Sequence, residues 1–468
     1  MSERENRVPP FGIKDKLGYM FGDFGNDFTF IFASSFLIVF YTKVLKIDSS
    51  LVGVLFLSAR FLDAVTDISM GRIVDASRGA RDGRFKPWIR RMAGPVALAS
   101  FLMYQSGMAG APMAWRLVYM WVTYLLWGSI FYTSINIPYG SMASAITNQP
   151  EERASLSTFR SVGASLAGLV IGVGVPMVLY ATDEAGNKLV IPSRFTLIAG
   201  VFSVLTVICY ALCYYLTTER VKIQPDPDRP RITLGQTFGA IVHNNALLAI
   251  IVAAILLLLS QLVSQAMNNY LFIDYFKSET GQSLVSFISA GALLALAPFT
   301  VKISNSFGKK EAGAVSMLIA GITFLALYFL KIENAYVFCA ISAVAYLGQG
   351  FFNLIVWAFI TDVIDYQEVK TKSREDGTVY AVYSFARKVG QALAGGLGGF
   401  ALTAVGYNSS LAVQTPEVTL GIYKIATLVP GLAFLAVAAV IAFWYPLSKK
   451  MVKENNEELK RRREAASN

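Results

Sequence analysis

Charged residues are scarce in this chain, and histidine and cysteine are scarcer still. Only 15% of the 468 residues are charged and 54% are apolar, whereas about 25% are charged in an average soluble protein. One histidine and three cysteines give little material for a metal centre, a disulfide framework or a catalytic nucleophile. The sequence also lacks a nucleotide-binding GxxxxGK loop. We therefore expect neither an enzyme nor a cofactor.

Long apolar runs fill the sequence instead. A membrane helix needs about 20 apolar residues to cross the hydrocarbon core, and such segments recur along the whole chain. They cover residues 17–42, 50–74, 88–108, 115–139, 156–181, 192–216, 243–273, 282–305, 311–331, 335–361, 379–405 and 421–446. Continuous runs of this length predict helices, because barrel strands would show short alternation. The expected fold class is an all-α membrane protein with twelve transmembrane helices.

Basic residues indicate the orientation of these helices. Arginine and lysine crowd the loop between residues 72 and 91, whereas the loop after the third span has no charge before Arg116. The positive-inside rule then places both termini in the cytoplasm, as expected for a multi-pass protein of the cytoplasmic (inner) membrane. The net charge of +10 is explained by these loops, so we expect a lipid bilayer and no nucleic acid as a partner. A monomer is expected.

A polar, proline-containing stretch divides the chain. It predicts a first bundle over 1–216, a cytoplasmic linker over 217–236, a second bundle over 237–446 and a basic tail over 447–468. The segment "FYTKVLKIDSSLVG" before the second span is echoed by "DYFKSETGQSLVS" before the eighth. Two parallel repeats favour an alternating-access carrier with its binding site near mid-membrane. A channel would need a filter segment or a ring of charges, and the sequence shows neither.

Three charges lie on one face of the second span. Arg60, Asp63 and Asp67 fall within about 60° of one another on a helix, and each costs about 2.5 to 3.5 kcal/mol at the bilayer centre. They must therefore face the protein interior or water. Asp63 and Asp67 can hold a coupling cation, either a shared proton or sodium, while Arg60 balances the charge. The alternative is a buried ion-pair network that only fixes helix packing.

Several motifs carry a resemblance to a known family. "SARFLDAVTDISMG", "GRFKPW", "YTSINIPYGS", "TDVIDYQE" and "SFARKVGQA" resemble the glycoside–pentoside–hexuronide:cation symporters of the major facilitator superfamily. The match covers nearly the whole chain, and "NIPYGSMASAITNQPEERASL" and "VQTPEV" are similar to the glucuronide carrier branch. The resemblance implies two pseudo-symmetric six-helix bundles that bring in a sugar or glycoside with a proton, sodium or lithium ion.

The resemblance also implies site residues. By resemblance, Asp63, Asp67 and Thr133 match the cation site, and Asp27, Arg160 and Lys388 match the substrate site. From their chemistry and position we add Thr66 to the cation site, and Asn26, Asn136, Tyr139 and Trp357 to the substrate site. Tyr139 and Trp357 would stack on sugar faces, although packing is the alternative for each. Five charges are assigned to coupling or gating: Arg60 balances the charge at the cation site, while Arg84, Lys86, Asp362 and Asp365 would latch the two halves on the cytoplasmic side. Loop solvation is the simpler alternative for the loop charges.

Departures from the family pattern refine the expectation. Asn136 stands where melibiose permease has an aspartate, and Asn26 stands where it has a lysine. Losing a carboxylate favours the proton over sodium, because sodium prefers charged oxygen ligands. Arg160 and Lys388 can receive a carboxylate, so a glucuronide or other hexuronide is favoured. The alternatives are a sodium-coupled carrier of a neutral or sulfonated sugar and, more remotely, a transporter-like sensor without coupled flux.

Overall fold

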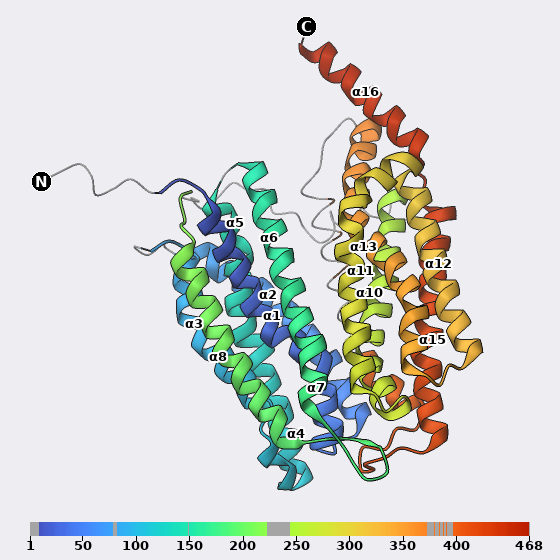
Figure 1. Cartoon of the computed structure of the whole chain (residues 1–468). Helices are drawn as coiled ribbons and strands as arrows, with labels where there is room; N and C mark the ends of the chain where they lie inside the picture. The colour runs from blue at the N-terminus through green and yellow to red at the C-terminus, as the bar shows by residue number, and fades with distance from the viewer. Residues whose placement is uncertain are drawn as a thin grey trace, which may run out of the picture. The chain divides into compact units, whose positions relative to one another are not determined.

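The computed structural model describes residues 9–77, 82–147, 149–221, 244–371 and 396–467, together with the isolated positions 379, 383, 387 and 390. The chain forms two compact units. Unit 1 contains Met1–Asp228 and Tyr407–Val413, and unit 2 contains Arg229–Gly406 and Gln414–Asn468. Each unit is a bundle of helices; in Figure 1 most of unit 1 runs from blue to green and unit 2 from yellow to red.

Unit 1 is built from helices, three π-helical turns, one 3-10 turn (η2) and one small hairpin over its described residues. Its helices are α1 Ile13–Val39, α2 Ser49–Ala76, α3 Lys86–Leu102, α4 Met113–Leu125, α5 Thr133–Ile146, α6 Pro150–Leu169, α7 Val175–Leu179 and α8 Pro192–Leu216. Its short turns are η1 Phe40–Val44, η2 Ser106–Gly110, η3 Leu126–Tyr132 and η4 Val170–Gly174. The strands β1 Tyr180–Thr182 and β2 Lys188–Val190 pair antiparallel, with Tyr180 opposite Val190. The fifth predicted span therefore ends at Leu179, where the strand begins, and not at 181.

Unit 2 is likewise helical over its described residues. Its helices are α10 Asn245–Tyr270, α11 Glu279–Phe307, α12 Lys309–Leu330, α13 Ala335–Thr371, α15 Pro416–Ala439 and α16 Lys449–Ser467, with π-helical turns η5 Leu271–Tyr275 and η6 Val440–Trp444. Helices occupy each predicted span; in the span 379–405 about half of the residues lie outside the described ones, and residues 396–404 are helical. The basic tail contains a helix, α16, in which buried Leu459 alternates with exposed charges.

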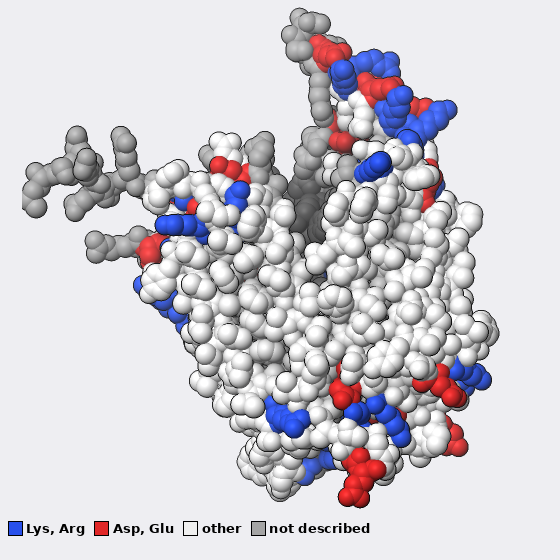
Figure 2. All heavy atoms as spheres, in the orientation of Figure 1, with Lys and Arg blue, Asp and Glu red and all other residues white. Residues whose placement is uncertain are grey.

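The helices have the properties of membrane spans. Among the described residues, eight helical segments have the length and hydropathy to cross a bilayer. On the face drawn in Figure 2, charged side chains gather at the two ends of each unit and leave an uncharged band between them. Such a band matches the hydrocarbon region of a membrane, which confirms the all-α membrane fold class.

Close helix crossings in both units depend on glycine. A Cβ added to Gly163 of α6 would lie 2.5 Å from the backbone oxygen of Met20 in α1. A Cβ added to Gly348 of α13 would clash in the same way with the backbone oxygen of Ser316 in α12. Small residues let membrane helices approach closely. Close packing stabilises the helix pairs, because the hydrophobic effect does not drive helix association within lipid.

The sequence echo between the two halves corresponds to a shared local structure. The π-helical turn η1 is followed by Lys46, whose φ is +56°, and η5 is followed by Lys277, whose φ is +54°. The next helix then begins with a side-chain cap in both halves. Asp48 accepts a hydrogen bond from the backbone of Ser50 at 2.8 Å, and Ser278 accepts one from Gly281 at 3.0 Å.

Candidate functional site

A π-helical turn lies beside the charged face of α2. The turn η3 joins α4 to α5 and brings Ser129, which is 2% exposed, against Asp63. π-Helical turns shift the register of a helix and often occur at functional sites. Here the turn places two hydroxyl side chains toward α2, one at Ser129 and the other one helical turn later at Thr133.

Two carboxylates of α2 each accept a hydrogen bond from one of these hydroxyls. Ser129 Oγ donates to Asp63 Oδ1 at 2.6 Å, and Thr133 Oγ1 donates to Asp67 Oδ1 at 3.0 Å. The two carboxylates are four residues apart on α2, and the two hydroxyl residues are also four residues apart. The two hydrogen bonds therefore lie one helical turn apart between neighbouring helices. We call these four residues the carboxylate–hydroxyl ladder. It brings together three predicted site residues and adds Ser129, which the sequence reasoning missed.

Arg60 lies at one end of the ladder. Its guanidinium is 3.6 Å from Asp63 Oδ2, and the side chains of Arg60 and Asp63 are 26% and 17% exposed. Asp63 is therefore contacted on one oxygen by a cation and on the other by Ser129. Thr66, predicted for the cation site, instead donates its hydroxyl to the backbone oxygen of Asp63 at 3.1 Å. A role for Thr66 in the cation site stays a prediction.

Asn26 of α1 is fixed from both ends of its amide. Its Nδ2 donates to the Tyr132 hydroxyl at 2.9 Å, and its Oδ1 accepts from Tyr210 at 3.1 Å. The neighbouring Asp27 is 8% exposed, and among the described residues it receives a single, long hydrogen bond of 3.5 Å, from Asn26. Asn26 is therefore rigidly held beside a carboxylate that keeps hydrogen-bonding capacity.

Arg160 of α6 pairs with Asp23, one turn before Asp27 on α1. The Nε–Oδ1 distance is 2.8 Å, and the Arg160 side chain remains 40% exposed. The guanidinium also lies 5.4 Å from the centre of the Tyr139 ring. That ring stacks on Tyr19 at 4.7 Å, and its hydroxyl donates to the Tyr19 backbone oxygen at 2.6 Å. Tyr139 is fully buried, and this arrangement makes it a support for Arg160.

The other predicted substrate residues are placed less fully. Asn136 lies half-buried on α5. The side chain of Trp357 and the whole of Lys388 lie outside the described residues. The roles of all three therefore stay predictions.

The predicted gating residues contact partners within their own units. Lys86 Nζ donates to the backbone oxygen of Thr217 at 2.7 Å, and Arg84 Nε donates to that of Val74 at 3.1 Å. In unit 2, Asp362 pairs with Lys309 at 2.6 Å. Asp365 is half-buried on the same helix. A latch between the two halves stays a prediction.

The first residues of the predicted linker are part of unit 1. The Glu219 carboxylate accepts backbone hydrogen bonds from Arg84, Phe85 and Lys86 at 2.7, 2.9 and 2.8 Å. These N–H groups open α3, so an anion here satisfies donors that lack partners within the helix. A Cβ at Gly83, whose φ is +119°, would lie 2.5 Å from this carboxyl group.

Arg220, the next residue, binds the start of α1. It pairs with Asp15 at 2.8 Å, and its backbone N–H donates to the oxygen of Ala145 at the end of α5. We call residues 217–221 the linker root. It ties the ends of α1, α3, α5 and α8 together. The sequence does not reveal it, because polar residues beside prolines are typical of a linker. The proline near the start of α3, Pro87, is the one signal, since the first N–H groups of a helix need acceptors.

Charges outside the spans also have local partners at this end of unit 1. Asp82 accepts from the Tyr214 hydroxyl at 2.8 Å and lies 3.2 Å from Arg90. Burial opposes the charged form slightly, but this hydrogen bond and the nearby cation hold the pKa of Asp82 below its usual value.

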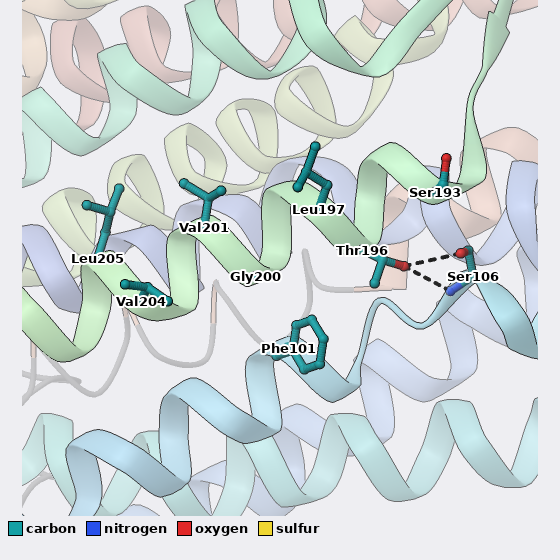
Figure 3. A pocket seen from close by; sticks show the side chains of 9 residues that line it. All are labelled: Phe101, Ser106, Ser193, Thr196, Leu197, Gly200, Val201, Val204 and Leu205. Atoms are coloured by element: carbon teal, nitrogen blue, oxygen red, sulfur yellow. Dashed lines mark hydrogen bonds between the residues drawn. The ribbon is translucent and has the colours of Figure 1, made fainter.

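An apolar groove lies elsewhere in unit 1, between α3 and α8. It has a volume of about 780 Å³ and is lined by Phe101, Ser106, Ser193, Thr196, Leu197, Gly200, Val201, Val204 and Leu205. Figure 3 shows Thr196 bonded to Ser106 at one end, and the Phe101 ring and aliphatic side chains along the rest. The groove contains no charged side chain, so the ladder and the Asp23–Arg160 pair remain the candidate site.

Comparisons with known proteins show the family of the chain. A family model described as "MFS/sugar transport protein" matches residues 18–449. The glucuronide carrier protein homolog of Escherichia coli is 30% identical, with 94% of this chain and 93% of that protein covered. A putative sulfoquinovose importer of Salmonella typhimurium is 32% identical, with 100% and 97% covered.

Solved structures show the same fold. The crystal structure of a D-xylose-proton symporter superposes with a TM-score of 0.63 at 13% identity, covering 93% of this chain and 97% of that one. At this identity the likeness concerns the fold alone. The family match, by contrast, spans almost the whole chain and confirms the resemblance seen in the motifs. The chain belongs to the MFS/sugar transport protein family and is therefore an integral membrane transporter and not an enzyme.

Proposed function

We propose that this transporter imports a glycoside together with a proton by alternating access, and that a glucuronide or other hexuronide is its substrate. The carboxylate–hydroxyl ladder carries this proposal. Two carboxylates, each held by a hydroxyl one turn apart on a neighbouring helix, form a site where a small cation can neutralise charge inside a membrane span.

The proton is the favoured coupling ion. Asn136 replaces a family carboxylate on the span that carries Ser129 and Thr133, and sodium prefers several charged oxygens. Protonation of Asp67 needs no such shell, because the Thr133 hydroxyl also lies 3.3 Å from the Gly128 backbone oxygen and can turn its hydrogen there. Sodium bound at Asp63 and Asp67 is the alternative.

An anionic substrate is supported by Arg160. Its guanidinium donates to Asp23 through Nε and also contacts the Tyr19 hydroxyl, which leaves further N–H donors on a side chain that is 40% exposed. We propose that Asp27, Asn26, Asn136, Trp357 and Lys388 complete the substrate site, with Tyr139 positioning Arg160 beneath it. The relatives named for a glucuronide and for sulfoquinovose, a sulfonated sugar, both point to acidic sugars. A sulfonated sugar is therefore the second candidate.

The cycle follows from the cost of unpaired charge. A cation at Asp63 and Asp67 neutralises the α2 stripe and favours substrate binding, and the loaded or the empty carrier then rearranges. We propose that the protein is a monomer of the inner membrane with cytoplasmic termini, and that Arg84, Lys86, Asp362 and Asp365 latch the cytoplasmic side. The basic loop between residues 72 and 91 supports this orientation.

Uptake into membrane vesicles tests the proposal. A radiolabelled glucuronide and a neutral galactoside would be compared under an imposed pH gradient and, separately, an imposed sodium gradient. We expect glucuronide accumulation driven by the pH gradient alone. Accumulation driven only by sodium would favour the alternative ion, and uptake that ignores both gradients would remove symport altogether.

A further inference from the structure

A neutral polar seam joins two helices of unit 2. Gln261 Nε2 of α10 donates to Asn353 Oδ1 of α13 at 3.1 Å, and Asn268 of α10 lies against the hydroxyl of Tyr346 on α13. The two contacts are seven residues apart on each helix and run in opposite directions, as antiparallel neighbours two turns apart require. We call these four residues, with Ser260 and Ser264, the polar seam.

Two serine hydroxyls of the seam are buried and unsatisfied. Ser260 is 0% exposed, and the Oγ atoms of Ser260 and Ser264 have no hydrogen-bond partner among the described residues. Helical spacing places both serines within about 100° of Gln261 and Asn268 on α10. Ser264 lies between the two contacts along the helix, so its hydroxyl adjoins groups that already bridge to α13.

These serines differ from several other hydroxyl residues of unit 2, although Ser304 of α11 is likewise buried without a partner among the described residues. Ser286 and Thr300 of α11 and Thr323 of α12 donate to the backbone oxygen four residues earlier, at 3.0, 2.8 and 2.8 Å. That bond is the usual way to satisfy a hydroxyl inside a membrane helix. Ser260 and Ser264 forgo it, and a buried hydroxyl without a partner destabilises the fold. Packing alone therefore does not explain them.

We propose that the polar seam binds the ring hydroxyl groups of the transported sugar. A serine hydroxyl both donates and accepts, and the amides of Gln261 and Asn353 offer a donor and an acceptor in fixed orientation, which matches the hydroxyls of a pyranose. The sequence of α10 contains no charged residue, so the seam recognises the neutral part of the substrate. The inference rests on the proposed function and assigns unit 2 a share of its specificity.

The double variant Ser260→Ala/Ser264→Ala tests the inference, with Ser286→Ala as the matched control because its hydroxyl is satisfied within its own helix. Proteoliposome uptake would give the KM for methyl glucuronide, methyl glucoside and their monodeoxy analogues. Loss of one or two neutral hydrogen bonds should raise KM for the transported parent sugar about 3- to 10-fold. At least one deoxy analogue should show no such rise, because it lacks the hydroxyl that the serines bind.

Thermal stability separates binding from packing. If the serines bind substrate, the double variant keeps or raises its Tm, because buried unpaired hydroxyls have been removed. An unchanged KM for every sugar, or an equal rise for parent and deoxy sugars with a lower Tm, would overturn the proposal.

Calorimetry on the purified protein, with the same sugars and no gradient, separates this proposal from the proposed function. Wild-type protein that binds a sugar but does not accumulate it contradicts symport and still tests the seam through Kd. Wild-type protein that binds none of them contradicts both.

Discussion

The turns before α2 and α11 have the same structure, but the helices that follow carry different chemistry. Both turns combine a π-helical segment, a lysine with positive φ and a side-chain cap. α2 then carries Arg60, Asp63 and Asp67 within eight residues, whereas α11 has no charge between Glu279 and Lys302. The repeated scaffold is therefore conserved between the halves independently of the charges placed on it.

This difference indicates a division of labour between the units. Charge inside a span is costly, so it is kept where the function needs it. Unit 1 holds the ladder and the Asp23–Arg160 pair, while the described contacts between α10 and α13 of unit 2 are neutral. Lys388, which the sequence assigns to the second half, lies outside the described residues. We infer that unit 1 couples the ion and binds the acidic group of the substrate, while unit 2 binds sugar hydroxyls.

The largest effect is expected from Asp67→Asn. An amide cannot take up and release the coupling proton, so concentrative uptake should disappear while downhill exchange of substrate persists. Uptake and counterflow in vesicles measure the two activities. Glu279→Gln changes the carboxylate in the first turn of α11 and should leave accumulation intact. Equal losses in both variants would contradict the comparison between α2 and α11.

Asp15→Ala should cause a large loss of stability. Arg220 would lose its carboxylate partner, and removing one member of a buried ion pair costs about 3 to 5 kcal/mol. The side chains of Asp15 and Arg220 are only 3% and 16% exposed. Thermal unfolding in detergent would measure the change. Lys309→Ala breaks the more exposed pair of unit 2 and should lower Tm less; the reverse order would contradict the importance of the linker root.

Gly163→Leu and Gly348→Leu should destabilise both halves. Each side chain would collide with the backbone of a neighbouring helix, and overpacking costs about 1 to 3 kcal/mol or more. Gly94→Leu and Gly291→Leu are matched controls, because a Cβ at either position meets nothing within 4 Å. If only one of the two variants lowers the Tm of the protein, the two glycine crossings are not equivalent.

The smallest effect is expected from Lys46→Gly and Lys277→Gly. A non-glycine residue at positive φ is strained, and glycine relieves this at some entropic cost, so each variant should gain about 0.5 to 1 kcal/mol. Equal increases of Tm would sharpen the equivalence of the two turns. A loss in either variant would indicate that the lysine side chain has its own role there.

The sequence predicted the features that depend on local pattern. Apolar length located the spans, and helical spacing placed Asp63 and Asp67 on one face. Contacts between distant segments were not predictable in the same way. Ser129 meets Asp63 only because η3 is π-helical, which shifts its register, and an ordinary periodicity does not reveal this. Arg160 pairs with Asp23, and nothing in the sequence favours Asp23 over Asp27, which lies one helical turn later on α1.

The linker root has a practical consequence for dividing the chain into two co-expressed fragments. A cut at residue 216, where α8 ends, would leave Glu219 and Arg220 on the wrong fragment. In the first fragment, the backbone N–H groups at the start of α3 would lose their acceptor, Glu219, and the Asp15 carboxylate would lose its partner, Arg220. A break placed after residue 221 keeps these bonds in one piece, so complementation between fragments should succeed there and fail five residues earlier.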